Sequence, residues 1–334
     1  MSGRYSNFFR KKGERIVCTL CRHYCSLPEG GTGICGVNRN SGGVLETLVY
    51  GRVSAINIDP VEKKPLYHFL PSTSTLSIGT VGCNFRCPFC QNWSISQTSD
   101  MEGSYEISPS EIVNLAIEKG CGSIAYTYNE PTIFYPFARD VAVLAKSRGL
   151  KNIFVSNGFE TVETIEDMRG VIDAFNIDLK SFDRDYYKKV LKGDLDAVLD
   201  TLAGLKKGGF WVEVTTLIVP GDNDSDEELE AMAEFISREM GPETPWHLSA
   251  FHPDYKVTDR RPTSIRSLYR AMEIGREKGL YYIYPGNVAI DAVTVCPGCG
   301  MELIVRRGFE VVTDNLERGE CPGCHRRIEG VWGD

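Results

Sequence analysis

The 334-residue sequence lacks the features that mark several classes of protein. No run of 18 apolar residues occurs, so no membrane-spanning helix is expected. Residues 1–12 are polar and basic and contain no apolar segment, so no secretory signal peptide is visible. The 37 Lys and Arg residues are outnumbered by 45 Asp and Glu, and this acidic balance weighs against nucleic acid or an anionic membrane as a partner. We therefore expect a cytoplasmic protein.

The overall composition is that of an ordinary globular protein. Charged residues make up 25% and hydrophobic residues 42% of the chain, which excludes disorder, collagen and coiled coil as the main architecture. At roughly 150 residues per domain, the length corresponds to about two domains.

Cysteine is the residue that stands out, with 12 copies. A cytosolic chain keeps its thiols reduced, and clustered cysteines there usually indicate metal binding or catalysis. Eleven of them fall into three groups, and Cys121 stands alone as an expected buried thiol. The groups are an N-terminal one (Cys18, Cys21, Cys25, Cys35), a central one (Cys83, Cys87, Cys90) and a C-terminal one (Cys296, Cys299, Cys321, Cys324).

The middle of the chain alternates between β-rich apolar runs and patterns of helical period. Such alternation indicates βαβ units and a parallel sheet. Six or seven units over about 215 residues favour an α/β fold with a partial (β/α)6 TIM-like barrel, in which functional residues follow the carboxyl ends of the strands. The expected strands are Thr75–Val81, Ser123–Tyr126, Asn152–Ser156, Ala174–Leu179, Trp211–Val219, Trp246–Phe251 and Tyr281–Tyr284.

The cysteine groups divide the chain into three predicted parts. Residues 1–71 form a small cysteine-rich metal-binding module, residues 72–290 form the barrel, and residues 291–334 form a second small metal-binding module.

The central group has the spacing C-x3-C-x2-C directly after the first expected barrel strand. Three thiolates in one loop can bind three irons of a [4Fe–4S] cluster, which leaves the fourth iron open to a small molecule. The alternatives are a zinc site with a distant fourth ligand and a cluster of buried thiols.

This motif, with Phe89 before its last cysteine, resembles the signature of the radical S-adenosylmethionine (SAM) superfamily. The wider run of residues 82–92 resembles the activating-enzyme-like branch, typified by pyruvate formate-lyase activating enzyme. Within that branch it is most similar to the radical SAM proteins of the AmmeMemoRadiSam system.

The resemblance implies a radical SAM enzyme, an oxidoreductase that reductively cleaves SAM at a [4Fe–4S] cluster held by Cys83, Cys87 and Cys90. The resulting 5′-deoxyadenosyl radical abstracts hydrogen from a substrate that the sequence does not identify. The resemblance also implies a low-potential electron donor, ferredoxin or flavodoxin, and a small-molecule or protein substrate.

Residues after the next two strands extend the resemblance. The run Tyr128-Asn129-Glu130-Pro131 stands where the superfamily has a Gly-Gly-Glu turn that holds the SAM amino group. It departs from that turn by having Tyr128 and Asn129 for the glycines. Asn157 lies in a Ser-Asn-Gly run similar to the family's Thr-Asn-Gly and is a candidate SAM contact. The alternatives are an ordinary loop glutamate for Glu130 and a plain turn for Asn157.

The later strands supply three further candidates for cofactor binding. Asp178 and Lys180 match an Asp-x-Lys pair that in activating enzymes binds the ribose and carboxylate region of SAM. The strand period of two places both on one face, where they alternatively form an ion pair without a ligand. His252 is a candidate to face SAM or substrate, and the alternative is a hydrogen-bonded structural histidine.

The terminal groups predict additional metals. The C-terminal group contains two C-x2-C pairs separated by 21 residues, a spacing typical of a zinc ribbon, with short strands expected at Leu303–Arg307 and Glu310–Thr313. A rubredoxin-type iron site uses the same ligands. The N-terminal group has irregular spacing that fits zinc, which we slightly favour, or an auxiliary iron–sulfur cluster.

Two other functions are compatible with these patterns. One is an activase that generates a glycyl radical on a partner protein. The other is a non-catalytic metal-rich scaffold or electron carrier, which would not need Glu130, Asn157, Asp178 and Lys180 at strand ends.

Overall fold

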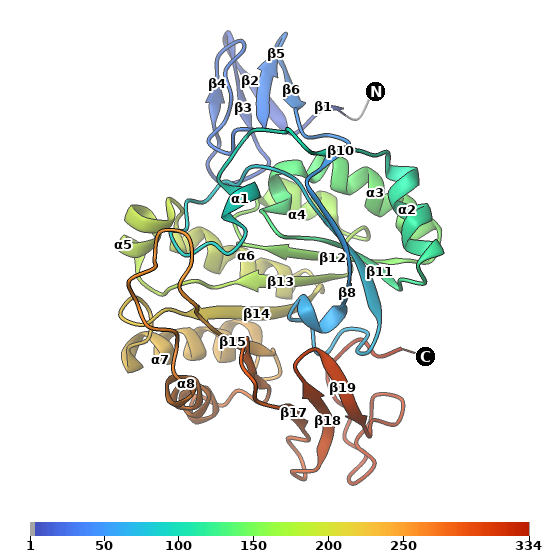
Figure 1. Cartoon of the computed structure of the whole chain (residues 1–334), viewed down its shortest axis with the longest axis vertical. Coiled ribbons are helices and arrows are strands. Elements are labelled where there is room, and N and C mark those ends of the chain that lie inside the picture. Colours follow the sequence, from blue (N-terminus) through green and yellow to red (C-terminus); the bar gives the residue numbers. More distant parts are fainter. Residues whose placement is uncertain (1–3, 334) are drawn as a thin grey trace. The chain divides into compact units, whose positions relative to one another are not determined.

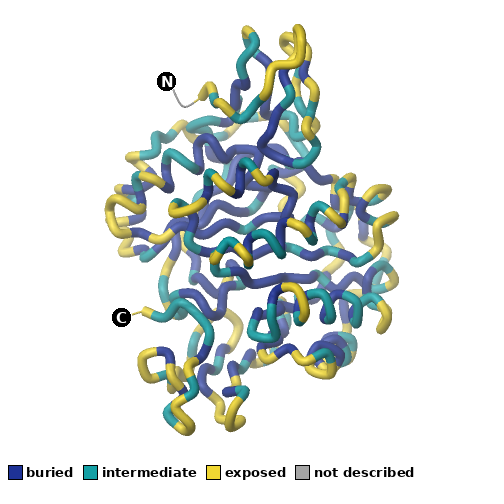
Figure 2. The backbone as a smooth tube through the Cα atoms, turned by 180° about the vertical axis from the view of Figure 1, so that it is seen from behind, coloured by how far each residue is buried: buried dark blue, intermediate teal, exposed yellow. Residues whose placement is uncertain are grey.

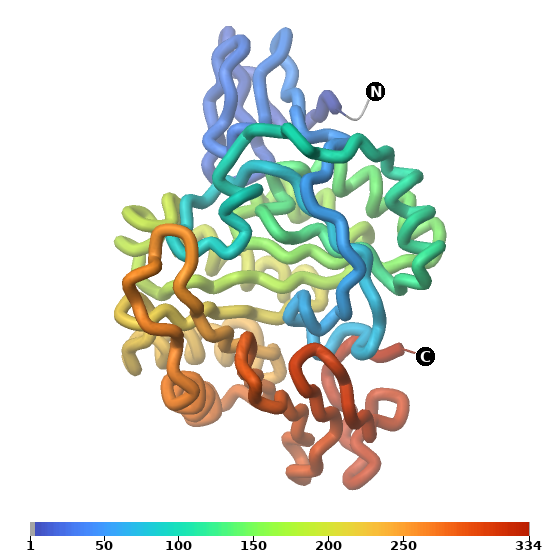
Figure 3. Tube along the Cα trace, in the orientation of Figure 1, coloured from blue at the N-terminus to red at the C-terminus, as the bar shows by residue number. Residues whose placement is uncertain are grey.

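The computed structural model describes residues 4–333, which form two compact units built from separated stretches of chain. The first unit contains residues up to 59 together with 74–175 and 184–204. The second contains residues 60–73, 176–183 and 205 onward. Figure 3 follows the chain through these stretches by colour. The division into modules 1–71, 72–290 and 291–334 remains a prediction, and its outermost residues, 1–3 and 334, lie outside the described part.

The first unit is centred on parallel strands. Strand β11 (Ser123–Tyr126) pairs in parallel with β9 (Ser74–Gly79) on one side and with β12 (Lys151–Ser156) on the other. Strand β8 (Ala55–Pro60) lies beside β9. These three parallel strands are confirmed within about two residues of their predicted ends. They are largely buried, as their dark blue colour in Figure 2 shows, because helices cover them.

The helices of this unit begin where local chemistry favours them. Helix α2 (Pro109–Glu118) has Pro109 at its first position and a capping box in which Ser108 and Glu111 satisfy each other's backbone N–H groups. The other helices are α1 (Trp93–Ser96), η3 (Pro131–Phe134), α3 (Tyr135–Ser147), α4 (Val162–Met168), α5 (Arg184–Tyr186), η4 (Tyr187–Leu191) and α6 (Leu195–Lys207). A short pair joins β7 (Arg52–Val53) to β10 (Tyr105–Glu106).

The N-terminal part of the first unit forms two small antiparallel sheets, seen together in Figure 1. Of the N-terminal cysteines, Cys18 ends a strand, and the other three lie in connections between strands. One sheet has the order β1-β6-β5 and the other the order β2-β3-β4. Their strands are β1 (Tyr5–Ser6), β2 (Phe9–Lys12), β3 (Arg15–Cys18), β4 (Ser26–Leu27), β5 (Asn38–Ser41) and β6 (Val44–Thr47).

The second unit repeats the parallel pattern. Strand β15 (Trp246–Ala250) pairs in parallel with β14 (Trp211–Ile218) and with β16 (Ile283–Gly286). Strand β13 (Ala174–Asp178) crosses the unit boundary, and the Leu179 N–H after it donates to the Thr215 carbonyl of β14. The helices are η2 (Val61–Lys63), α7 (Asp226–Phe235), η5 (Ile236–Met240) and α8 (Ile265–Glu277).

The predicted α/β alternation is therefore confirmed as a mixed α/β fold, whereas closure into a partial barrel remains a prediction. The strand predicted at Tyr281–Tyr284 instead spans Ile283–Gly286. The difference arises because Tyr281 N–H bonds to Pro242 O in the turn that follows α8. No helix among residues 4–333 is long and apolar enough to cross a membrane.

The C-terminal residues of the second unit form an antiparallel sheet with its own buried attachments. Its strands are β17 (Ala292–Val295), β18 (Glu302–Arg307) and β19 (Glu310–Asp314). The fully buried Arg306 of β18 donates to Tyr67 O at 2.6 Å, and its guanidinium lies 4.4 Å from the centre of the Tyr67 ring. Cys296 and Cys321 share one apolar core with Tyr67 and Tyr284. This sheet is thus packed into the unit.

A buried carboxylate, Glu213 of β14, organises the same region. Its Oε2 accepts from the Tyr67 N–H at 2.9 Å and contacts Nε2 of His247 at 2.7 Å. Its Oε1 accepts from the His68 N–H at 2.8 Å and the Trp211 indole N–H at 3.0 Å. Burial alone would raise the pKa of Glu213, but His247 and the other partners outweigh it and lower that pKa. Glu213 therefore holds the segment 67–68 against the sheet as an anion.

We expect Glu213→Gln to lower the free energy of unfolding by about 3 kcal/mol, because an amide NH2 would face N–H donors that a carboxylate accepts. Urea unfolding followed by circular dichroism measures this change. The exposed Glu239→Gln is the matched control and should stay within about 0.5 kcal/mol of the parent protein. Equal effects of the two substitutions would contradict the organising role of Glu213.

Candidate active site and metal centres

The loop that carries the central cysteines, residues 82–92 (hereafter the Cys83 loop), leaves the first unit's sheet after β9. It starts at Gly82, whose φ is +88° and whose Cβ, if present, would lie 2.6 Å from the Cys35 carbonyl oxygen. Only glycine fits both demands. Arg86 holds the loop in place. Its guanidinium donates to the Cys83 carbonyl of the same loop at 2.7 Å and to the Ile34 carbonyl of the N-terminal segment.

The three thiols of this loop face a common region. Burial first, then the Glu130 carboxylate and the Cys87 thiol, with a further contribution from Cys90, raise the pKa of Cys83. The Phe85 N–H points at the Cys83 sulfur at 3.4 Å, and Sγ of Cys90 lies 3.1 Å from the Ser96 hydroxyl. Phe89 is buried. Cys87 is buried, whereas Cys83 and Cys90 are partly exposed, so the group is reachable from solvent.

Tyr128 and Asn129 stand where the superfamily pattern has two glycines. Tyr128 has φ of +71°, a left-handed conformation that favours glycine. Hydrogen bonds of its hydroxyl to Asp59 at 2.8 Å and from Asn57 at 3.0 Å hold it there. Asn129 donates to the Gly82 carbonyl at 2.8 Å and accepts from the Thr80 N–H at 3.1 Å. The Asn129 side chain thus fixes the start of the Cys83 loop.

Glu130 joins the ends of two neighbouring strands. Its Oε1 accepts from Thr132, through both N–H at 3.0 Å and hydroxyl at 2.7 Å, and from the Ser156 hydroxyl at 2.9 Å. Its Oε2 accepts from the Asn157 N–H at 2.8 Å. The side chain is buried, so the turn after β11 and the turn after β12 are held in one arrangement.

A second buried carboxylate, Glu160, shares these partners. The Thr132 hydroxyl lies 3.1 Å from Oε1 of Glu160, and the Ser156 hydroxyl bonds to the same oxygen. Burial, followed by repulsion from Glu160, raises the pKa of Glu130 to about 7, and burial also raises the pKa of Glu160. Two carboxylates that share hydroxyl donors in the interior favour holding one proton between them.

Asn157 presents an open acceptor beside the Cys83 loop. Its amide nitrogen donates to Oδ1 of Asn84 at 2.8 Å, and Asn84 directly follows Cys83. Its Oδ1 is buried and has no hydrogen-bond partner among the described residues. A buried acceptor without a partner costs free energy, and a bound polar ligand would satisfy it. The residues around the three thiols therefore fit a cluster with a polar small molecule beside it.

The remaining predicted cofactor contacts belong to the second unit. Asp178 and Lys180 form an ion pair at 2.7 Å and are both partly exposed. Asn223 donates to the Lys180 carbonyl at 2.8 Å and anchors that residue. His252 lies two residues after the end of β15, is exposed, and has Nε2 3.2 Å from the Asn287 carbonyl oxygen. All three residues lie at or after the carboxyl ends of their strands, as predicted.

Sequence reasoning did not single out several residues that build this site. Asn84 lies inside the cysteine motif and was readable there. Ser156 stands in the Ser-Asn-Gly run but was given no role there. Glu160 and Thr132 belong to no recognisable pattern, because they meet Ser156 only where two turns come together in space. The first unit contains the Cys83 loop and the two turns that carry Glu130 and Asn157.

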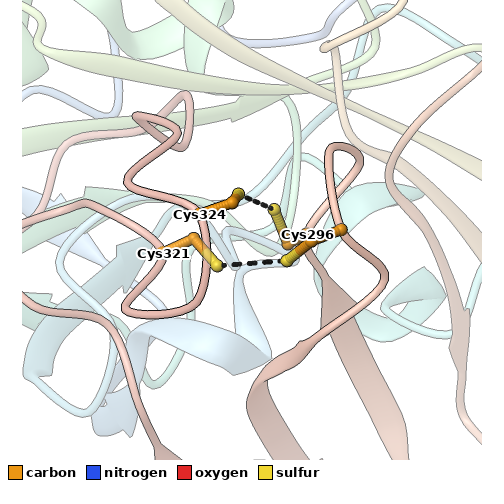
Figure 4. A group of neighbouring side chains, drawn as sticks. Cys296, Cys321 and Cys324 are labelled. Carbon is orange, nitrogen blue, oxygen red and sulfur yellow. Dashed lines mark hydrogen bonds between the residues drawn. The ribbon is translucent and has the colours of Figure 1, made fainter.

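The C-terminal cysteines are arranged for a single metal ion. Among residues 4–333 they are the only group of three or more His, Cys, Asp or Glu whose ligand atoms all lie within 4.8 Å of one another. Sulfur pairs Cys296–Cys324 and Cys299–Cys321 are each 3.6 Å apart. Figure 4 labels Cys296, Cys321 and Cys324 and marks the contacts with dashed lines. Tetrahedral bonds of about 2.3 Å would place sulfurs about 3.8 Å apart. This group could therefore bind a metal ion.

Comparison with known proteins agrees with the motif and the fold. The family model described as the radical SAM superfamily matches residues 77–236. An uncharacterised protein of Methanocaldococcus jannaschii is 43% identical over 98% of this chain and 99% of its own length. The pyruvate formate-lyase-activating enzyme of Clostridium pasteurianum is 24% identical over 53% of this chain and 80% of that enzyme.

In two further matches the aligned region covers a smaller share of the other protein. The benzylsuccinate synthase activating enzyme of Thauera aromatica is 27% identical over 39% of this chain, which spans only 40% of that enzyme. The crystal structure of Streptococcus suis SuiB bound to S-adenosylmethionine has a TM-score of 0.51 at 13% identity, over 68% of this chain and 53% of SuiB.

The chain belongs to the radical SAM superfamily, whose members are enzymes with an iron–sulfur cluster. Its matches to activating enzymes place it in the activating-enzyme-like branch of that superfamily.

We expect Glu160→Gln to flatten the dependence of stability on pH. The folded-state pKa values of Glu130 and Glu160 are raised, so their stabilising contribution is complete below about pH 4.5 and is lost as the pH rises toward 7. Between pH 5 and pH 8 the parent protein should lose about 2 kcal/mol more stability than Glu160→Gln, as measured by anaerobic urea unfolding. The exposed Glu166→Gln serves as control and should follow the parent. Parallel curves for parent and Glu160→Gln would contradict a shared proton.

Proposed function

We propose that this protein is a radical SAM enzyme whose Cys83, Cys87 and Cys90 bind a [4Fe–4S] cluster. The observation that carries this proposal is the buried Oδ1 of Asn157, which has no hydrogen-bond partner among the described residues. The same side chain donates to Asn84 of the Cys83 loop, so this acceptor lies beside the three cysteines. When bound, the cluster and SAM supply a 5′-deoxyadenosyl radical that abstracts hydrogen from the substrate.

The chain's own residues position the reactants. The three thiolates of the Cys83 loop would bind three irons and leave the fourth for SAM. Asn129 holds the loop at Gly82, and Glu130 holds the Asn157 backbone, so both turns keep their places when ligand arrives. Asn157 Oδ1 would then accept a hydrogen bond from SAM. Phe89, which is buried within the loop, would pack beside the cofactor.

The other polar groups of SAM are assigned to residues that the motif resemblance implies. We assign Asp178 to the ribose hydroxyls and Lys180 to the carboxylate, because an acceptor and a cation match those groups. Their mutual ion pair holds both charges ready at the strand end. His252, exposed after β15, is assigned to SAM or to the substrate.

The substrate is a small molecule or a protein, and the electron comes from a low-potential donor such as ferredoxin or flavodoxin in the cytoplasm. A glycyl-radical activase is the second candidate. It is favoured by the relatives, which include activating enzymes of pyruvate formate-lyase and of benzylsuccinate synthase.

The C-terminal cysteine group is proposed to bind structural zinc as a zinc ribbon. Four thiolates close the coordination sphere, and no open position remains for catalysis. The Gly298 N–H points at the Cys296 sulfur at 3.4 Å, and an N–H donor directed at sulfur favours a thiolate ligand. A rubredoxin-type iron at these ligands would be seen as one iron without sulfide.

We expect the anaerobically purified protein to release 5′-deoxyadenosine from SAM when dithionite is supplied. Cys83→Ala, Cys87→Ala or Cys90→Ala should each reduce that release to the level of a protein-free control, because one iron loses its ligand. Product is quantified by chromatography.

The matched control is Cys121→Ala, which removes a thiol outside all three groups and should retain activity. If protein with a full central cluster never cleaves SAM, the proposed function is wrong. A metal-rich scaffold or electron carrier would then account for the protein better.

We expect Asn157→Ala to weaken SAM binding about tenfold while leaving the iron content unchanged. The substitution removes one hydrogen bond to SAM, which is worth about 1.4 kcal/mol. Calorimetric titration of SAM into the cluster-containing protein measures the dissociation constant. Unchanged affinity would show that Asn157 has only the structural role of bonding to Asn84.

A further inference from the structure

The four N-terminal cysteines surround one cavity in the first unit. Cys18, Cys21, Cys25 and Cys35 all line one small pocket that is partly open to solvent. The other walls are mainly apolar and include Leu20, Ile34 and Ile133. The proposed reaction assigns no role to this cavity.

The spacing of these thiols differs from that of the C-terminal group. No three of them lie within 4.8 Å of one another, whereas all four C-terminal thiols do. One tetrahedral ion draws its sulfur ligands to about 3.8 Å from each other. In a cluster, by contrast, each cysteine binds a different iron, so the sulfurs stand further apart around a larger body. The open arrangement therefore fits a cluster better than one zinc ion.

Each of the four sulfurs also faces an N–H donor. Backbone N–H groups of Leu20, His23 and Ile34 hydrogen-bond to the sulfurs of Cys18, Cys21 and Cys25, respectively. The Asn38 side-chain amide donates to the Cys35 sulfur at 3.5 Å. N–H groups directed at sulfur stabilise thiolates and tune iron–sulfur clusters. The donors come from both small sheets and their connections, so the pocket is a built site.

This cavity lies directly behind the Cys83 loop. The Cys35 carbonyl occupies the space that a side chain at Gly82 would need. Arg86 of the loop donates to the Ile34 carbonyl, and His23 Nε2 lies 2.9 Å from the Asn84 carbonyl. The segment that carries the N-terminal cysteines is thus in direct contact with the Cys83 loop.

We propose that Cys18, Cys21, Cys25 and Cys35 bind an auxiliary [4Fe–4S]-type cluster, distinct from the cluster at Cys83, Cys87 and Cys90. Four thiolates around it leave no iron open to SAM, so this cluster does not cleave SAM. The inference reverses the slight preference for zinc given in the sequence analysis, where the irregular spacing fitted either metal site. It does not depend on the proposed function.

The test counts acid-labile sulfide, because a zinc site contains none. The full-length triple variant Cys83→Ala/Cys87→Ala/Cys90→Ala is purified anaerobically without reconstitution and analysed for iron, sulfide and zinc and by Mössbauer spectroscopy. We expect about four irons and four sulfides per chain to remain. Zinc in the N-terminal group with no sulfide would overturn the proposal. The Cys121→Ala protein controls for loss of a thiol and should match the parent.

A second variant keeps the test decisive if the triple variant fails to fold. In otherwise intact protein, Cys18→Ala/Cys25→Ala should lower sulfide by about four per chain and leave the central cluster's SAM cleavage measurable. Unchanged sulfide together with loss of one zinc would overturn the proposal. Because sulfide is counted without SAM, failure of SAM cleavage alone would reject the proposed function and leave the auxiliary cluster standing.

Discussion

The candidate site depends on the hydrogen bonds that the Glu130 carboxylate accepts. This carboxylate accepts hydrogen bonds from residues 132, 156 and 157, and so ties the turn after one parallel strand to the turn after the next. Parallel strands bring such turns to the same edge of a sheet, but they do not by themselves set the distance between them. Burial makes this link strong, since no water competes for the carboxylate, and the nearby Glu160 makes it sensitive to proton binding.

The chain uses cysteine in three arrangements that differ by geometry more than by residue type. The C-terminal thiols are drawn together in pairs 3.6 Å apart, a distance suited to one ion. The N-terminal thiols stand further apart around a cavity. The central three share one loop that Gly82 and Arg86 hold in place. Distance between sulfurs thus separates a single-ion site from a cluster site where residue identity cannot.

Fold and site were predictable to different degrees. Strands such as Ser123–Tyr126 were readable because buried parallel strands are short apolar runs between helical patterns. The radical SAM motif was readable because its three cysteines are local in sequence. The left-handed Tyr128 could not be foreseen, since its conformation rests on hydroxyl contacts with Asp59 and Asn57 from another segment. Glu160 was not predicted, because one of the hydroxyls that it shares with Glu130 belongs to Thr132, 28 residues away in the chain.

The sequence by itself determined the superfamily, the α/β alternation and the three cysteine groups, because each of these rests on residues close together along the chain. Only the tertiary structure decided which polar atoms remain without partners, as Asn157 Oδ1 does, and how far apart the cysteine sulfurs stand. It also decided that Cys35 abuts Gly82, joining residues 47 positions apart (82 − 35). Spacing along a chain limits which atoms can meet, whereas packing between segments determines which of them do.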